Sequence, residues 1–167
     1  MKKIIVIPLD ERPCNYNFNK DMTKGMPYEV VLPPLEIMGN KKTPGNMDEI
    51  IKWLKEESKN ASGIVVALDT MLYGGIVPSR LHYDSKETLI NRLNVLREIK
   101  ADNPEILIYA YQLLMRNPAY SSSDEEPDYY ADFGREIHLY GVYKHKLDLG
   151  IITEVEKEHL LEIEKEL

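Results

Sequence analysis

The chain has 167 residues and a formal net charge of −7. That length suits one domain with an ordinary hydrophobic core, and the acidic balance argues against a nucleic-acid-binding protein, which would present a basic face. The single cysteine, Cys14, excludes an internal disulfide, and the apolar start of the chain is too short for a signal peptide or a membrane span. We therefore expect a cytoplasmic protein whose partner is neither nucleic acid nor membrane.

Four short apolar runs are rich in β-branched residues or tyrosine and lack helical spacing. They cover residues 4–9, 29–32, 64–68 and 106–114. This pattern predicts four buried strands. Between them, apolar residues recur three and four positions apart in 47–54 and 89–99, which predicts amphipathic helices. A weaker helix is expected over 15–25.

Capping residues indicate where several of these helices begin. Asn46 and Asp84 each stand three residues before a glutamate, which predicts that they are N-caps. Beyond the fourth strand, Pro127 is expected to open a tyrosine-rich helix, and Thr153 with Glu156 to begin the last one.

Apolar strands that alternate with amphipathic helices predict an α/β fold. We expect a parallel sheet of about four strands with helices on both faces, either a Rossmann-like domain or the first half of a larger α/β domain or barrel. No fifth strand follows, and the last helix ends in acidic residues without a glycine stop. Residues 1–167 are therefore interpreted as a single α/β domain at the N-terminal end of a longer protein, or as a domain with a frayed last helix.

Charged residues follow the predicted strands, where α/β proteins bind their ligands. If the strands are parallel, the ends of separate strands would bring together Asp10, Arg12, Asp69, Arg80 and Arg116. Polar turns are common on any protein surface, so it is this convergence that favours a site.

Two of the connecting segments carry further chemistry. The segment "DTMLYGGIVPSR" is expected to be a long, packed loop whose Gly74-Gly75 pair permits a positive-φ turn or a close approach to a ligand. The segment "RNPAYSSSDEEPDYY" places acids before a helix, where they can stabilise its N-terminus. Alternatively, Asp124 and Glu126 with Arg116 and Tyr120 offer the carboxylates and ring faces that a polyhydroxylated ligand needs.

Four blocks occur in order along the chain: "IPLDERPCNYNF", "VLPPLEIMGNKKTPGN", "VALDTMLYGGIVPSR" and "RNPAYSSSDEEPDYYADFGREIH". On these blocks the sequence resembles bacterial domain-of-unknown-function family 4127. The family consists of much longer chains, so the resemblance implies a C-terminal remainder, and it carries no established activity. It also implies that Asn15, Tyr73, Gly74, Gly75 and Ser79 belong to the family's signature.

The leading hypothesis is an enzyme, a hydrolase with paired carboxylates that acts on a polar small molecule of carbohydrate type. The candidate catalytic residues are Asp10, Asp69, Asp124 and Glu126. The candidate substrate-binding residues are Arg12, Asn15, Tyr73, Gly74, Gly75, Ser79, Arg80, Arg116 and Tyr120. No metal or cofactor is expected. The alternatives are a sugar- or metabolite-binding module without catalysis, and a structural fragment whose activity lies in the remainder.

Overall fold

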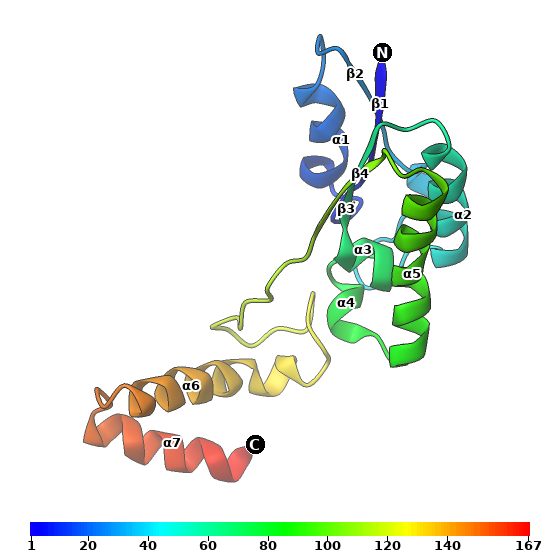
Figure 1. The fold of residues 1–167 in the computed structure, drawn as a ribbon. Coiled ribbons are helices and arrows are strands. Elements are labelled where there is room, and N and C mark those ends of the chain that lie inside the picture. Colours follow the sequence, from blue (N-terminus) through cyan, green and yellow to red (C-terminus); the bar gives the residue numbers. More distant parts are fainter. The chain divides into compact units, whose positions relative to one another are not determined.

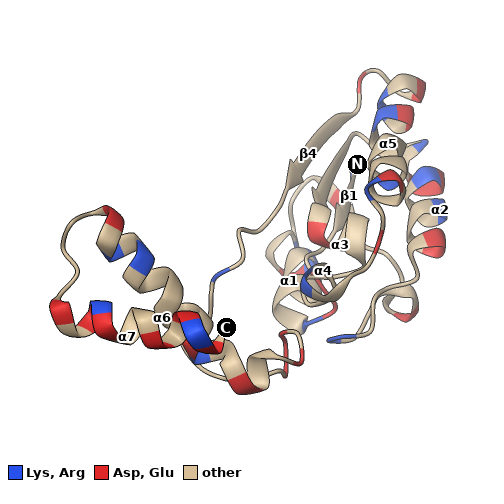
Figure 2. Cartoon of the chain, turned by 90° about the horizontal axis from the view of Figure 1, so that it is seen from below, with Lys and Arg blue, Asp and Glu red and all other residues tan.

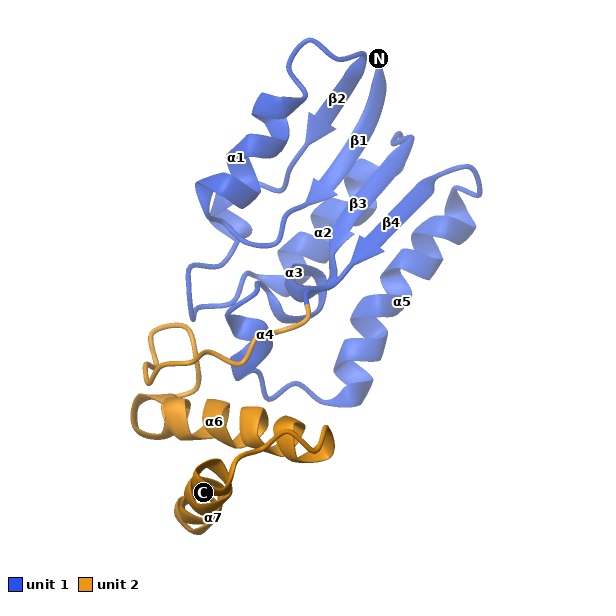
Figure 3. Ribbon diagram, turned by 90° about the vertical axis from the view of Figure 1, so that its left-hand side faces the viewer, with its two compact units in different colours: residues 1–113 blue, residues 114–167 orange.

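The computed structural model describes the whole chain, Met1–Leu167, which divides into two compact units. The first unit is Met1–Leu113 and the second is Leu114–Leu167 (Figure 3). All of the strands belong to the first unit, whereas the second is built on two helices.

The first unit contains a four-stranded sheet in which every strand is parallel to its neighbours. The strands are β1 (Lys2–Ile7), β2 (Tyr28–Val31), β3 (Gly63–Ala67) and β4 (Leu107–Tyr111), and their order in the sheet is β2-β1-β3-β4. The predicted parallel α/β fold of Rossmann-like type is confirmed. The fourth strand ends earlier than the apolar run predicted, at residue 111 and not 114.

Three main helices cover this sheet. Figure 1 shows α1 (Pro13–Met22) on one side, with α2 (Met47–Ser58) and α5 (Lys86–Asp102) on the other. This arrangement follows from right-handed crossovers, because the chain moves outward from β1 to β2 and then reverses direction to reach β3 and β4. The core lies between the sheet and the α2–α5 layer, where Ile5 and Ile64 are buried with Ile50, Leu54 and Ile99.

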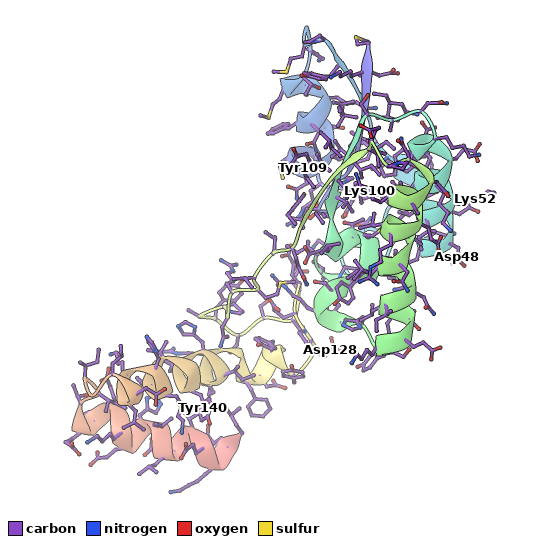
Figure 4. The ribbon with its side chains drawn as sticks, in the orientation of Figure 1. Asp48, Lys52, Lys100, Tyr109, Asp128 and Tyr140 are labelled. Atoms are coloured by element: carbon purple, nitrogen blue, oxygen red, sulfur yellow. The ribbon has the colours of Figure 1, made fainter.

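Two strands depart from the predicted burial. In β2, Tyr28 and Glu29 are exposed and Val30 and Val31 are half-buried, and β4 is also largely exposed. Leu107 and Tyr109 are 57% and 64% exposed, so the expectation that β4 is buried on both faces was wrong. Both crossovers that reach β3 and β4 place their helices on the same face of the sheet, which leaves the other face of β4 without a helix. Tyr109 accordingly projects to the side on which α1 lies (Figure 4).

In the first unit, hydrogen bonds at the helix starts confirm one predicted cap and correct another. Asn46 Oδ1 accepts the backbone N–H of Glu49 (3.2 Å), as predicted. The N-cap of α5 is Ser85, whose Oγ accepts the N–H of Thr88 (3.1 Å), and not Asp84. The carboxylate of Asp84 instead forms an ion pair with Arg92 (2.8 Å).

Two short helices cover most of residues 69–80, where a long loop was predicted. The segment folds into α3 (Leu68–Tyr73) and α4 (Pro78–Leu81), separated by residues 74–77, which include Gly74 and Gly75. A short 3-10 helix, η1 (Leu35–Ile37), lies in the connection between β2 and α2. The prediction failed because neither helix is long enough to show apolar periodicity.

The second unit contains α6 (Tyr130–Asp148) and α7 (Glu154–Glu166), which pack together. Figure 1 shows α7 running back beside α6. The predicted start of α7 is confirmed, since Thr153 and Glu156 form a reciprocal capping box. Glu156 also accepts a hydrogen bond from Lys146 of α6, and this bond, together with those from Thr153, lowers the pKa of Glu156 from 4.5 to about 2. A charge-assisted bond therefore joins the two helices.

Positive and negative side chains are mixed along the outer helices of both units (Figure 2). One such pair, Lys55 Nζ with Glu98 Oε2 (2.6 Å), joins α2 to α5. None of the helices combines the length and the apolar character that crossing a bilayer requires.

Candidate functional site

Asp10 follows β1 and lies immediately before α1. Its side chain is only 4% exposed. Oδ1 accepts hydrogen bonds from the backbone N–H of Arg12 (3.0 Å) and from Asn15 Nδ2 (2.7 Å), and Oδ2 accepts one from Arg12 Nε (2.6 Å). Arg12 is the N-cap residue of α1 and Pro13 its first residue, so the start of this helix sets the position of the arginine. The acceptor capacity of Asp10 is thus largely taken up within the protein.

Asp69 lies in the first turn of α3, just beyond the end of β3, and is 1% exposed. Its Oδ2 accepts the backbone N–H of Leu113 (3.1 Å), whereas its Oδ1 is buried and has no hydrogen-bond partner. A buried carboxylate oxygen without a partner is costly, and native proteins satisfy nearly all such atoms. Asp69 therefore carries an acceptor atom that the fold itself does not use.

The two aspartates lie at the carboxyl ends of adjacent parallel strands. Thr70 Oγ1 donates a hydrogen bond to the carbonyl of Leu9 (2.7 Å), which fastens the start of α3 to the residue before Asp10. The parallel pairing of β1 with β3 places these chain segments on the same edge of the sheet. The prediction that distant strand ends meet is thus correct for this pair of strands.

Tyr111 is a third member of this site that sequence reasoning missed. It is the last residue of β4 and pairs in register with Ala67 of β3. Burial raises the pKa of the Tyr111 hydroxyl, and the negative charges of Asp69 and then Asp10 raise it further. The negative charges of both carboxylates therefore act on the Tyr111 hydroxyl. Because the predicted strand continued to residue 114, the residues after its end were predicted to include Arg116 and not Tyr111.

Asp10, Arg12, Asn15, Asp69 and Tyr111 are referred to below as the carboxylate site. It contains one carboxylate whose oxygens are bonded by Arg12 and Asn15, one carboxylate with an unused oxygen, and one phenol. No three His, Cys, Asp or Glu side chains of the chain are grouped in a way that could hold a metal ion.

The predicted glycine pair occupies the turn between α3 and α4. Gly74 has φ +85°, and a Cβ there would lie 2.6 Å from the backbone nitrogen of Gly45. That same N–H of Gly45 donates to the Gly74 carbonyl (3.0 Å). The backbone of Gly74 is therefore packed closely against the loop before α2. Gly75 (φ +145°) donates its N–H to the Asp69 carbonyl (3.3 Å), which supports the turn that follows the carboxylate.

The remaining candidates of the first unit belong to α3 and α4. The ring of Tyr73 packs on that of His82, with centroids 4.4 Å apart. Ser79 Oγ donates to the Ile76 carbonyl (2.6 Å), and Arg80 lies beside it on α4. Their predicted contact with a substrate stays a prediction.

Four candidates belong to the second unit. Arg116 Nη2 donates to the Tyr120 hydroxyl (3.2 Å), and its guanidinium lies 5.9 Å from the ring centroid of Tyr120. Asp124 donates its backbone N–H to Ser122 Oγ (3.3 Å), and Glu126 is 7% exposed. Their predicted meeting with Asp10 and Asp69 stays a prediction.

Together, the fold and the site define an α/β protein of Rossmann-like type with acidic side chains at the carboxyl ends of neighbouring parallel strands. The chain belongs to the family described as "Protein of unknown function (DUF4127)", whose model matches residues 4–167, and the resemblance inferred from the sequence blocks is confirmed. No curated protein matches the chain, and no solved structure does.

Proposed function

We propose that this protein is a hydrolase that acts on a polar, hydroxyl-rich small molecule of the carbohydrate class. The observation that carries the proposal is the buried, unpartnered Oδ1 of Asp69, which lies in the same site as Asp10 and Tyr111. Hydrolysis of a glycosidic bond uses two carboxyl groups in different surroundings, one to donate a proton and the other to act as nucleophile or base.

The hydrogen bonds of the two aspartates suggest how these roles are divided. Asp69 has the free oxygen, so in its protonated form it is the group that would donate a proton to the leaving oxygen of the substrate. Asp10 carries the negative charge that would stabilise positive charge on the sugar ring as the bond breaks. Arg12 and Asn15 hold Asp10 in position for this role. Water then adds to the sugar carbon, and its proton returns to Asp69.

Tyr111 would orient the substrate. Its hydroxyl is influenced by both carboxylates, so a sugar hydroxyl bound there could bond the phenol and Asp69 together. The mixture of charges on the outer helices and the net charge of −7 support a small-molecule ligand and not a nucleic acid (Figure 2). The unpaired Cys14 supports a reducing compartment, the cytoplasm.

One observation favours a second candidate, a binding module without catalysis. Arg12 and Asn15 bond both oxygens of Asp10, so this group could serve only to neutralise charge and orient contacts to a bound sugar. A binding module would retain ligand affinity but would show no turnover.

The test compares the unaltered protein with Asp69→Asn and with the control Asp102→Asn, which changes an exposed aspartate at the end of α5. A thermal-shift screen with neutral sugars, sugar phosphates and divalent ions identifies ligands that stabilise the native state. Chromogenic nitrophenyl glycosides then measure hydrolysis. We expect Asp69→Asn to lower kcat/KM by about 10²–10⁴-fold, as for loss of a general acid, and Asp102→Asn to leave it unchanged.

Stability separates a functional Asp69 from a structural one. Asparagine has nearly the shape of aspartic acid and can still accept the Leu113 N–H, so we expect an unchanged or higher thermal midpoint. A lower midpoint with unaltered turnover would mean that Asp69 only supports the fold. Sugar binding without any turnover would establish the binding module instead.

A further inference from the structure

A pocket of about 580 Å³ lies in the first unit, between the loop before α2 and the segment that runs from α3 to α5. Its lining includes Gly45 and Asp48 on one side and Tyr73, His82 and Arg92 on the other. Figure 4 shows Asp48 on the first turn of α2. The volume is within the range of small-molecule sites. We refer to it as the Tyr73 pocket, and neither Asp10 nor Asp69 lines it.

Hydrogen bonds hold both walls of the Tyr73 pocket in place. On one side, the bond from Gly45 N–H to the Gly74 carbonyl (3.0 Å) joins the loop before α2 to the end of α3. On the other side, Arg92 of α5 bonds the Leu72 carbonyl and the carboxylate of Asp84 (2.8 Å). The pocket is therefore formed before a ligand binds, which reduces the ordering cost of binding.

The lining of the pocket includes two rings that pack against each other at a tilt of 38°. Tyr73 and His82 lie with their ring centroids 4.4 Å apart. The backbone N–H of Asp84 donates to His82 Nδ1 (3.2 Å), so the proton of the neutral imidazole is at Nε2. The histidine thus offers an apolar ring face and one hydrogen-bond donor.

The charges of the lining balance. Lys42 and Arg92 are cationic, while Asp48 and Asp84 are anionic, and Arg92 is already paired with Asp84. Apolar side chains and two prolines form much of the remaining surface, namely Pro44, Met47, Pro78 and Leu81. Such a lining has no strong preference for an anion or a cation, and it combines ring faces with hydrogen-bonding groups.

We propose that the Tyr73 pocket is a subsite for one ring of a neutral carbohydrate. The apolar face of the sugar packs on Tyr73 and His82, and its hydroxyl groups bond the carboxylate of Asp48 and the Nε2–H of His82. The choice of ligand class rests on the proposed function, whereas the pocket is built from other residues. Asp69 and Tyr73 lie four residues apart on α3, which separates the two sites by about one helical turn, ~6 Å along the axis.

The experiment titrates the ¹⁵N-labelled full chain with methyl glucosides, galactosides and mannosides by NMR, with AMP and inorganic phosphate as comparators. We expect saturable shifts with a neutral glycoside, at millimolar affinity, in the amides of Tyr73, His82 and Asp48. His82→Ala and Tyr73→Ala should each weaken binding at least tenfold. The matched control is Tyr109→Ala, which removes an exposed ring on β4 outside the pocket.

Three results would overturn the proposal: no saturable binding by any glycoside, unchanged affinity in folded His82→Ala, or tighter binding of AMP or phosphate at the same amides. His82 is exposed, so its alanine variant should fold even if Tyr73→Ala does not. Asp69→Asn distinguishes this inference from the proposed hydrolysis. In this variant the glycoside affinity reported by the amides of Tyr73, His82 and Asp48 should be unchanged, because Asp69 does not line the pocket. Glycoside binding at these amides by the unaltered chain, without any turnover, would support the pocket and refute the hydrolase.

Discussion

Replacing Gly74 with alanine tests the junction that supports one wall of the Tyr73 pocket. The residue has φ +85°, a conformation that costs an L-amino acid about 1–2 kcal/mol. The new Cβ would also lie 2.6 Å from the nitrogen of Gly45 and 2.9 Å from Cβ of Pro44. Since neither contact is to a flexible side-chain end, the loop must move.

The expected loss can be separated into two parts. Moving the loop breaks the bond from Gly45 N–H to the Gly74 carbonyl and leaves two buried backbone groups unpaired, at a further cost of about 1–3 kcal/mol. Gly25→Ala is the matched control, because Gly25 has φ +81° in the same unit but nothing within 4 Å of its Cβ position. We expect Gly74→Ala to lose about 3 kcal/mol and Gly25→Ala about 1 kcal/mol.

Urea unfolding followed by tryptophan fluorescence measures this difference. Trp53 is the only tryptophan of the chain, and it lies on α2, where it packs against the core of the first unit. The midpoint should fall more for Gly74→Ala while the m-value stays constant. Equal losses in the two variants would show that only the backbone angle matters and that the junction contributes nothing.

Two further predictions concern titration. The Tyr111 phenol should titrate above its usual pH in ¹³C NMR of labelled tyrosine, and Asp69→Asn should lower its pKa, whereas an unchanged value would separate Tyr111 from the carboxylate site. Glu156 should titrate near pH 2, and Lys146→Met should raise its pKa toward 4.5. Because the folded-state pKa of Glu156 is depressed, its contribution to stability is present above pH 4.5 and is lost as the pH falls toward 2; a salt-insensitive, unshifted titration would contradict this reasoning.

Local patterns were sufficient for most of the elements. The apolar runs predicted four strands, because a strand buried in a parallel sheet needs continuous apolar residues. Asn46 and Thr153 were predicted as N-caps because the bond involved spans only three residues. The same rule failed at Asp84. Its carboxylate forms an ion pair with Arg92, eight residues away, and Ser85 is the N-cap of α5.

The carboxylate site was predictable in part. Asp10 and Asp69 could be predicted to lie near each other because each follows a strand, and parallel strands end on the same edge of the sheet. Tyr111 could not be named, since its role depends on where β4 stops and on the two charges that face it. The unpartnered Oδ1 of Asp69 could not be predicted either, because the hydrogen bonds of this carboxylate depend on which backbone groups reach it after folding.

Residue order and type were therefore enough to establish the alternation of strands and helices, the direction of the sheet and the pair of acids at its edge. Those features depend on periodicity and on interactions between near neighbours in the chain. Tertiary packing decided that Gly74 meets Gly45, that Tyr73 and His82 line a pocket, and that β4 keeps one face exposed. These outcomes depend on contacts between segments 20 or more residues apart, such as Arg92 with the Leu72 carbonyl, and no local pattern encodes them.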